Sequence, residues 1–264
     1  MSYLSAKGIC AGYGKQTILE NISFQLEERS LLGIIGANGS GKTTLLKALC
    51  GILPHEGTCT LENTGLEHLS AKEIAKFVSY IPQRSGISID ISALDVVLMG
   101  FNPWLKLLEH PSKEMKEIAK QTLAQVGLAG KEDINYLHLS EGQKQLCILA
   151  RTLVSDTKLL LLDEPESALD FRFRYQMLTL LRSWVTGKKR SAVVALHDPS
   201  LALNFCDKLL LLSNGGVLDV IEPRTTSLDE MEKVLSVVYG SICLQRCSNR
   251  SGQSYLVMLK EGEP

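Results

Sequence analysis

The spacing of apolar residues changes several times along the chain, and each change predicts a different element. Residues 4–26 read as strand, turn and strand, because Ile22 and Phe24 alternate with polar neighbours, as in half-buried strands. Residues 31–35 form a short apolar strand, and residues 159–162 are four consecutive leucines. Leucines without alternation are typical of a central parallel strand that is buried on both faces.

Helix-start signals and shorter apolar runs predict the remaining elements. Ser70 and Ser140 each begin a capping box, so a helix is expected to start just after each of them. The other expected elements are strands at 77–81, 192–196 and 254–259, a hairpin over 209–220, and helices from Gly41, through Leu181 and after Ser227.

Residues 88–135 lose the strand pattern. Residues 95–99 and 113–126 have helical spacing, which predicts a helical lobe inserted into an α/β chain. The apolar side chains in this lobe fit either a core or a docking surface, and a core is favoured; they are Phe101, Trp104, Leu105 and Leu107.

Composition narrows the possible partners. The 264 residues are 45% hydrophobic and 22% charged, as in ordinary globular proteins, with a net charge of −1. Nucleic-acid binding favours a basic surface, so we expect no nucleic-acid partner. No apolar run approaches the roughly 18 residues that span a bilayer, and the N-terminus lacks a signal-peptide core.

A glycine-rich turn carries the first chemical signal. Residues 36–43, GANGSGKT, fit the P-loop pattern between a strand and a helix. Glycines let successive backbone N–H groups point at phosphate oxygens, and the helix start adds its positive dipole end. Lys42 would bridge the β- and γ-phosphates, and the Thr43 hydroxyl would bind Mg²⁺. The loop therefore predicts binding of a nucleoside triphosphate.

Polar residues at strand ends predict a catalytic edge. Asp163 and Glu164 follow the leucine run, and ligand sites of open α/β sheets lie at the carboxyl ends of strands. Asp163 would hold Mg²⁺ through water, and Glu164 would orient or deprotonate the attacking water. His197 ends the strand at 192–196, at the same edge, and Gln83 follows the strand at 77–81.

Two further positions are candidates for nucleotide contacts. Tyr13 lies between two glycines and could stack on a purine or serve as an ordinary turn residue. The helix that follows Ser140 is a second anion-binding start. The two helix starts could bind two phosphates, or the same phosphate from two copies of the chain.

Taken in order, Tyr13, the P-loop, Gln83, LSEGQ, LLLLDEP, SALD and His197 resemble the nucleotide-binding subunit of ATP-binding cassette (ABC) transporters. The resemblance extends from about residue 4 to residue 240. It implies an ATPase with a P-loop NTPase (RecA-like) core, an N-terminal antiparallel β subdomain and an inserted α-helical subdomain. By this resemblance residues 1–222 form the ATPase domain, with the helical insertion at about 88–155, and residues 223–264 form a short helix-and-strand extension.

The resemblance also implies a role for each site residue. Tyr13 is similar to the adenine-stacking residue, Gln83 to the residue that senses Mg²⁺ and the membrane partner, Glu164 to the catalytic base and His197 to the switch histidine. The phosphate-binding residues would be Gly36, Ala37, Asn38, Gly39, Ser40, Gly41, Lys42, Thr43 and Thr44. Ser140, Gly142 and Gln143 resemble the signature that completes the partner's ATP site, and Asp170 the D-loop. Mg²⁺ would be held by Thr43, Gln83 and Asp163, with Lys42, Gln83, Glu164 and His197 acting in catalysis.

The implied assembly is a head-to-tail homodimer with two ATP molecules at its interface. Its closure would drive two integral-membrane permease subunits at the cytoplasmic face of the inner membrane, where the subunit would lie peripherally. The segment VVLMGFNPW, the segment HDPSLAL and the tail SVVYGS resemble importers of iron–siderophore, haem or cobalamin, which also use an extracytoplasmic solute-binding protein. An exporter ATPase, another importer class and a soluble ABC ATPase are the alternatives.

Two residues depart from the family pattern. Glu141 stands where the signature normally has glycine, and Glu166 where threonine or serine often follows DEP. A carboxylate at position 141 would repel a nearby γ-phosphate, so slower or weaker dimer-coupled hydrolysis than in a glycine version is expected.

Overall fold

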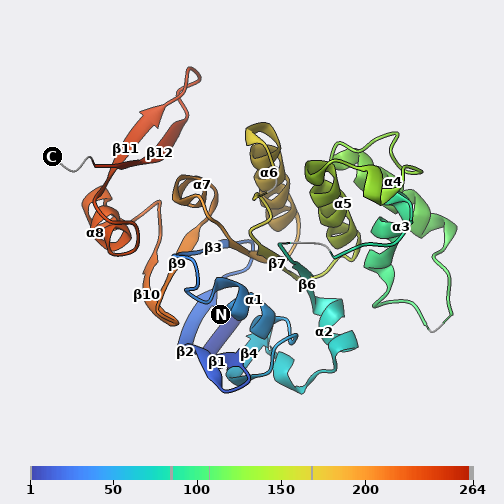
Figure 1. Cartoon of the computed structure of the whole chain (residues 1–264), viewed down its shortest axis with the longest axis horizontal. Coiled ribbons are helices and arrows are strands. Elements are labelled where there is room, and N and C mark those ends of the chain that lie inside the picture. Colours follow the sequence, from blue (N-terminus) through green and yellow to red (C-terminus); the bar gives the residue numbers. More distant parts are fainter. Residues whose placement is uncertain (1, 84–85, 107, 168, 262–264) are drawn as a thin grey trace.

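The computed structural model describes residues 2–83, 86–106, 108–167 and 169–261 and arranges them in layers (Figure 1). A six-stranded sheet lies in the middle, in the order β10–β9–β3–β8–β7–β6. Its strands are β3 (Leu31–Gly36), β6 (Val78–Ile81), β7 (Leu159–Asp163), β8 (Ser191–Ala195), β9 (Lys208–Ser213) and β10 (Gly216–Ile221). Neighbouring strands are parallel except β9 and β10, which form the predicted hairpin.

The leucine run of β7 is buried on both faces of the sheet, as its sequence predicted. Leu160 and Leu162 pack into the core on one face of the sheet, and Leu159 and Leu161 into the core on the other face. All four are fully buried. Because both faces are covered, apolar residues are needed at every position, which explains the missing alternation.

An antiparallel sheet covers one face, together with the helix α1 (Lys42–Leu49). Its strands are β1 (Leu4–Tyr13), β2 (Gln16–Leu26), β4 (His55–Leu61) and β5 (Thr64–Gly65), in the order β2–β1–β4–β5. The β1–turn–β2 prediction is confirmed. Strands β4 and β5 were not predicted, because β4 alternates weakly and is held by pairing with the distant β1.

Helices cover the opposite face and both ends of the sheet, except α2 (Ala71–Phe77), whose Ile74 packs into the core on the side of the antiparallel sheet. The others are α3 (Ala93–Leu98), α4 (Lys113–Gln125), α5 (Glu141–Val154), α6 (Phe171–Gly187), α7 (Pro199–Phe205) and α8 (Leu228–Tyr239). Short 3-10 turns occupy Leu66–His68, Met99–Phe101 and Tyr136–His138. Both capping boxes are confirmed. Helix α6 continues past the expected end at Leu181 because Val185 is also buried, and α7 was not predicted.

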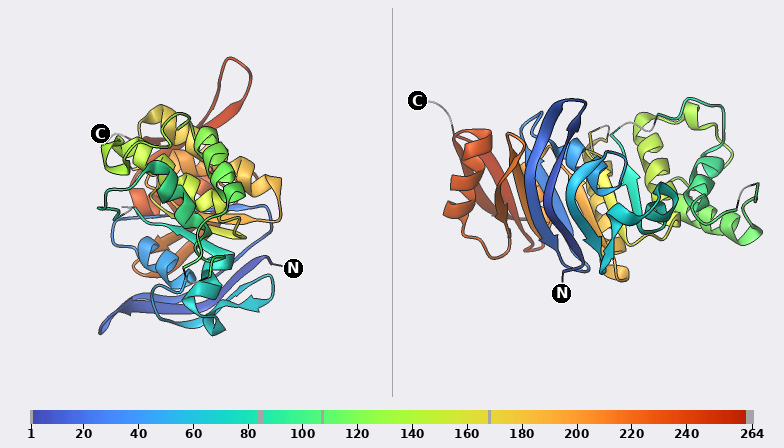
Figure 2. Two further views of the ribbon diagram at one scale, coloured as in Figure 1. Left: turned by 90° about the vertical axis from the view of Figure 1, so that its right-hand side faces the viewer. Right: turned by 90° about the horizontal axis from the view of Figure 1, so that it is seen from below.

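Helices α3, α4 and α5 pack together at one end of the molecule (Figures 1 and 2). Phe101 and Leu105 are buried in the core, as favoured. Trp104 is not a core residue, because 51% of its surface is exposed. Leu107 lies outside the described residues.

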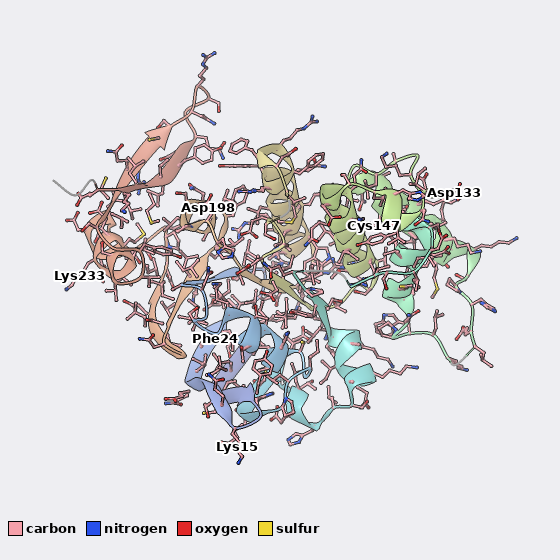
Figure 3. The ribbon with its side chains drawn as sticks, viewed as in Figure 1. Lys15, Phe24, Asp133, Cys147, Asp198 and Lys233 are labelled. Carbon is pink, nitrogen blue, oxygen red and sulfur yellow. The ribbon has the colours of Figure 1, made fainter. Side chains whose placement is uncertain are left out.

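The C-terminal part lies at the other end, where α8 is followed by the hairpin β11 (Ile242–Ser248) and β12 (Ser254–Lys260) (Figure 1). Strand β12 was predicted and β11 was not. Asn204 of α7 exchanges two hydrogen bonds with the backbone of Leu256. The Ser200 hydroxyl accepts another from the Met258 N–H at 3.0 Å. Figure 3 labels Asp198, at the start of α7, between the central sheet and this hairpin.

Candidate nucleotide-binding site

The P-loop connects β3 to α1 and has a shape that only glycine permits at one position. Gly41 adopts a φ of 103°, in the left-handed region, directly before α1. A side chain there would also place its Cβ 2.5 Å from the Leu19 Cδ2 atom. The Ser40 hydroxyl is buried and has no hydrogen-bond partner among the described residues. A buried polar atom of this kind is costly unless a ligand or water satisfies it.

Lys42 lies under this loop, where its side chain is only 5% exposed. Its ammonium group donates to the carbonyl oxygens of Gly36, at 3.0 Å, and Ala37, at 3.3 Å. The closest carboxylate oxygen, Oε1 of Glu164, is 3.7 Å away. The cation is therefore held mainly by neutral carbonyls, which a phosphate group can replace with a stronger charge-assisted contact.

Thr43 and Asp163 form the candidate magnesium site. The Thr43 hydroxyl donates to Asp163 Oδ1 at 2.9 Å, joining α1 to the end of β7. The Tyr80 hydroxyl donates to the other carboxylate oxygen at 3.2 Å. Burial raises the pKa of Asp163, against the lowering effect of these two hydrogen bonds. Tyr80 was missed in the sequence because nothing in β6 distinguishes it from a packing residue.

Glu164 collects contacts from two other strand ends. Its Oε2 atom accepts from the Gln83 amide at 2.8 Å, after β6, and lies 2.8 Å from His197 Nε2, after β8. Glu164 also has a φ of 48°, which is strained for a residue with a side chain. The parallel register of β6, β7 and β8 thus brings three residues together that are far apart in the sequence.

A pocket of about 250 Å³ opens beside the P-loop. Its lining combines the predicted residues with one unpredicted apolar residue, Ile18: Tyr13, Ile18, Asn38, Gly39, Gly41, Lys42, Thr43, Thr44 and Glu164. The Tyr13 ring is about half exposed, with Lys47 Nζ 5.9 Å from its centroid. An exposed aromatic ring next to a phosphate cradle suits stacking on a base.

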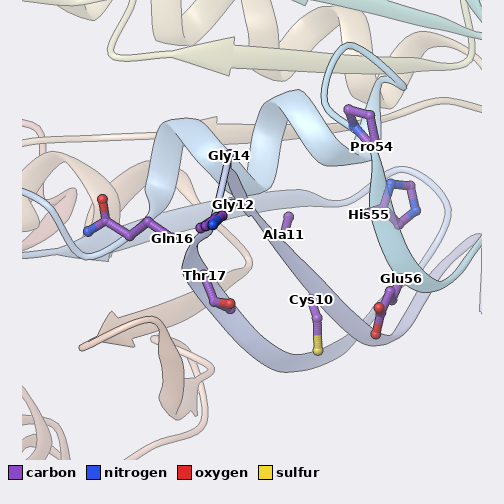
Figure 4. Close-up of a pocket in the computed structure, with 10 residues that line it drawn as sticks. Cys10, Ala11, Gly12, Gly14, Gln16, Thr17, Pro54, His55 and Glu56 are labelled. Carbon is purple, nitrogen blue, oxygen red and sulfur yellow. The ribbon is translucent and has the colours of Figure 1, made fainter.

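A separate pocket of about 380 Å³ lies between the β1–β2 turn and the start of β4 (Figure 4). It is lined by Cys10, Ala11, Gly12, Gly14, Lys15, Gln16, Thr17, Pro54, His55 and Glu56. This lining includes none of the predicted site residues, although Gly12 and Gly14 flank Tyr13.

The signature segment, Ser140–Gln143, has a different character. Ser140 caps α5 by accepting from the Gln143 N–H, and Glu141 pairs with Lys144 at 2.7 Å. Ser140 and Glu141 are exposed. No hydrogen bond or ion pair between described residues joins this segment to the P-loop. Asp170 likewise contacts its own helix, accepting from the Phe173 N–H at 3.0 Å as the cap of α6.

The residues at the P-loop fit a nucleotide with Mg²⁺. A hydroxyl and a carboxylate 2.9 Å apart supply the oxygen ligands that Mg²⁺ takes. The buried ammonium, the unpartnered Ser40 hydroxyl and the helix start supply the contacts for a phosphate chain. Within the described residues, no helix combines the length and apolar character needed to cross a membrane.

Comparison with known proteins agrees with this chemistry. Residues 19–167 match the profile of the family described as ABC transporter. The hemin import ATP-binding protein HmuV of Vibrio parahaemolyticus is 35% identical over 220 residues, covering 81% of this chain and 83% of that protein. A Helicobacter pylori protein named for iron chelatin transport and ATP binding is 37% identical over 214 residues, covering 80% of this chain and 84% of that protein.

Among solved structures, a chain of an ABC transporter assigned to the metal-chelate type, in an inward-facing conformation, superimposes with a TM-score of 0.82. It is 26% identical in sequence, and the match covers 99% of each chain. With these similarities and the P-loop geometry together, the chain belongs to the ATP-binding subunits of ABC transporters, a family of ATPases.

Proposed function

We propose that this protein is the ATPase subunit of an importer for a metal chelate of the iron–siderophore, haem or cobalamin type. One observation above the others supports an ATPase whose site is completed by a partner chain. The P-loop, Asp163, Glu164, Gln83 and His197 converge within one chain, whereas the signature segment is exposed and bonded only to itself. Each chain thus has one phosphate-binding site at its P-loop. At the start of α5 it also has a helix start that could complete the site of a second chain.

At the cradle, each side chain would have one task. Lys42 would leave the loop carbonyls and contact phosphate oxygens, while Tyr13 stacks on adenine. Mg²⁺ held by Thr43, Asp163 and Gln83 neutralises phosphate charge when it is bound. Glu164 would take the proton of the attacking water, and His197 would contact the γ-phosphate while keeping Glu164 oriented.

The partner chain would supply the other half of the site. Ser140, the Gly142 N–H and Gln143 lie at the start of α5, where the helix dipole favours an anion. Asp170 caps α6 close by, since a Cβ on Gly142 would come 3.4 Å from the preceding Leu169. A head-to-tail homodimer would therefore close two sites at once, and hydrolysis would depend on that closure.

The helical end would transmit closure to two integral-membrane permease subunits. Trp104 and Ile89 are more than half exposed there, and Leu108 is 88% exposed. A pocket of about 380 Å³ on the same end is lined by Asp95, Leu98, Met99, Asn102, His110, Pro111 and Lys116. The subunit would lie peripherally on the cytoplasmic face of the inner membrane. An extracytoplasmic solute-binding protein would deliver the chelate.

In this proposal residues 1–222 form the ATPase domain, with a helical subdomain inserted at about 88–155. Residues 223–264 form an extension that packs on the core through α8, where Met231 and Leu235 are fully buried.

Complementation between two inactive variants tests the shared site. Lys42→Ala should abolish the cradle of its own chain, and Ser140→Arg should abolish the half-site that its chain offers to a partner. In a mixed dimer one site carries both defects and the other carries neither. Mixing the two purified variants should therefore restore ATPase activity, to about a quarter of the wild-type rate if dimers form at random and sites act independently.

The matched control mixes Lys42→Ala with Lys42→Ala,Ser140→Arg, which leaves no intact site in any dimer. If the first mixture is as inactive as this control, each site is built from a single chain and the dimer proposal is wrong. If Ser140→Arg alone keeps the wild-type rate, the signature segment takes no part in hydrolysis.

A further inference from the structure

Glu166 is a buried carboxyl group beside the catalytic edge that the proposed mechanism does not use. Its side chain projects from the loop after β7, and only 2% of the residue is exposed. Oε1 accepts a hydrogen bond from the His197 backbone N–H at 2.9 Å. Oε2 is fully buried and has no hydrogen-bond partner among the described residues.

We propose that Glu166 is a positioning residue for the switch histidine, and that it acts in its neutral form. The contact to the His197 backbone fixes the point where β8 ends and the loop to α7 begins. From that point the imidazole reaches Glu164 Oε2 at 2.8 Å. Glu166 therefore acts on hydrolysis through His197. The inference rests on the role proposed above for His197.

The surroundings explain why the neutral form fits. An ionised carboxylate accepts several hydrogen bonds, and a buried one without them is strongly disfavoured. The titratable groups facing Glu166 are Glu164 in the same loop, His197 after β8 and Cys206 after α7. Burial is the main cause that raises the pKa of Glu166, against the lowering effect of the backbone N–H groups of His197 and Glu166, and the charge of Glu164 raises it further.

Ionisation should therefore disturb the His197 loop. A charged Oε2 would need a donor that the described residues do not provide, so the loop would shift or admit water. Either change moves His197 away from its contact with Glu164. We expect kcat to fall as pH rises, while the KM for ATP changes little because the P-loop is untouched.

Three variants separate positioning from simple packing. Glu166→Gln keeps an acceptor for the His197 N–H and cannot ionise. Glu166→Leu keeps a similar volume and removes the acceptor. Glu114→Gln, on the exposed face of α4, is the control for losing a carboxylate.

Steady-state ATPase assays from the most acidic to the most alkaline pH at which the protein stays folded give the readout. Glu166→Gln should stay within about threefold of the wild-type kcat at the acid end and lose the wild-type decline toward alkaline pH. Glu166→Leu should lower kcat by about tenfold at every pH, with the KM within about twofold. Glu114→Gln should follow the wild-type profile.

Superimposable pH profiles of wild type and Glu166→Gln would overturn the inference, and so would a wild-type kcat for Glu166→Leu. If Glu166→Leu does not fold, the Glu166→Gln profile still decides. His197→Ala, measured in parallel, separates the two levels. A wild-type kcat for His197→Ala contradicts the role proposed above for His197, whereas an inactive His197→Ala with superimposable Glu166→Gln profiles contradicts only the role of Glu166.

Discussion

The P-loop and the signature segment both lie at helix starts, yet they are bonded in different ways: α1 begins at Gly41 without a side-chain cap, and α5 is capped by Ser140. Around the P-loop, Lys42, Thr43 and Glu164 contact residues from four separate strand ends. Around the signature segment, Ser140, Glu141 and Gln143 contact only their own helix. Both regions present the first N–H groups of a helix. They differ in how many distant parts of the chain form hydrogen bonds or ion pairs with them.

We expect this difference to separate the proposed chemistry from the proposed association of two chains. A site held by long-range contacts is pre-organised and costs little reorganisation during the reaction. A capped helix start that, among the described residues, has no long-range hydrogen bond or ion pair can meet another surface without breaking such contacts. Changes at the P-loop should therefore alter chemistry, and changes at the signature segment should alter association.

The largest expected effect is at Glu164. Glu164→Gln removes the proposed base but keeps the hydrogen bond from Gln83, so kcat should fall by about 10³-fold while ATP-dependent dimers persist. ATPase assays and size-exclusion chromatography with light scattering measure the two properties. Glu230→Gln, at the start of α8 and exposed, is the matched control. A kcat within tenfold of wild type would exclude Glu164 as the base.

Long-range and exposed contacts should also differ in their effect on stability. Asp207 makes long-range contacts that hold the start of β3. Its carboxylate binds Arg182 of α6 and accepts from the Leu31 N–H at 2.9 Å. Burial alone would raise the pKa of Asp207, but these hydrogen bonds lower it below its usual value. Asp207→Asn should therefore reduce the free energy of unfolding at pH 7 by about 2 kcal/mol.

The sign of the pH dependence follows from the lowered pKa. The stabilisation is complete above the unfolded-state pKa of about 3.9 and is lost as pH falls through the lower folded-state value. Urea unfolding at pH 7 and below about pH 3 should show the gap between wild type and Asp207→Asn shrinking. Lys188→Gln breaks an exposed ion pair and should cost no more than about 0.5 kcal/mol. Equal losses in the two variants would contradict the expected difference between this partly buried pair and the exposed pair.

A smaller effect is expected at the proposed magnesium ligands. Thr43→Val keeps the volume but removes the hydroxyl, so the Mg²⁺ concentration for half-maximal ATPase activity should rise by about tenfold. Thr43→Ser restores the hydroxyl and should return the value to near wild type. An unchanged Mg²⁺ requirement in Thr43→Val would exclude Thr43 from the magnesium site.

The smallest effect is expected at Glu141, in the signature segment. Lys144 partly compensates this exposed carboxylate, so Glu141→Gly should raise the ATPase rate or dimer affinity only about threefold. The effect should weaken with added salt. Unchanged rate and affinity would show that Glu141 does not oppose the γ-phosphate.

The sequence predicted the elements that local patterns define. Capping boxes at Ser70 and Ser140 and the leucines of β7 matched the structure because their signals lie within a few residues. Strands β4 and β11 were missed because distant or later partners stabilise them. Trp104, grouped with the core residues, is half exposed, although its indole N–H donates to the carbonyl oxygen of the buried Ser155 at 3.2 Å.

In the candidate site, too, residues with local sequence signals could be predicted, and contacts between distant segments could not. Each P-loop and strand-end residue has a signal in its neighbours, which is why the chemistry could be proposed from sequence. Tyr80, Ile18 and the Glu166–His197 contact depend on register between strands that are remote in the sequence. Their roles remain proposals, as do those of the predicted residues.

The bonding of Glu164 has a consequence for the timing of catalysis. One of its oxygens already serves both Gln83 and His197, and the other faces Lys42 at 3.7 Å. A water molecule that approaches Oε2 must therefore displace the Gln83 amide or the His197 imidazole. If Glu164 is the base that we propose, a shift of either neighbour would expose this oxygen, so the two strand ends after β6 and β8 would set when it can act.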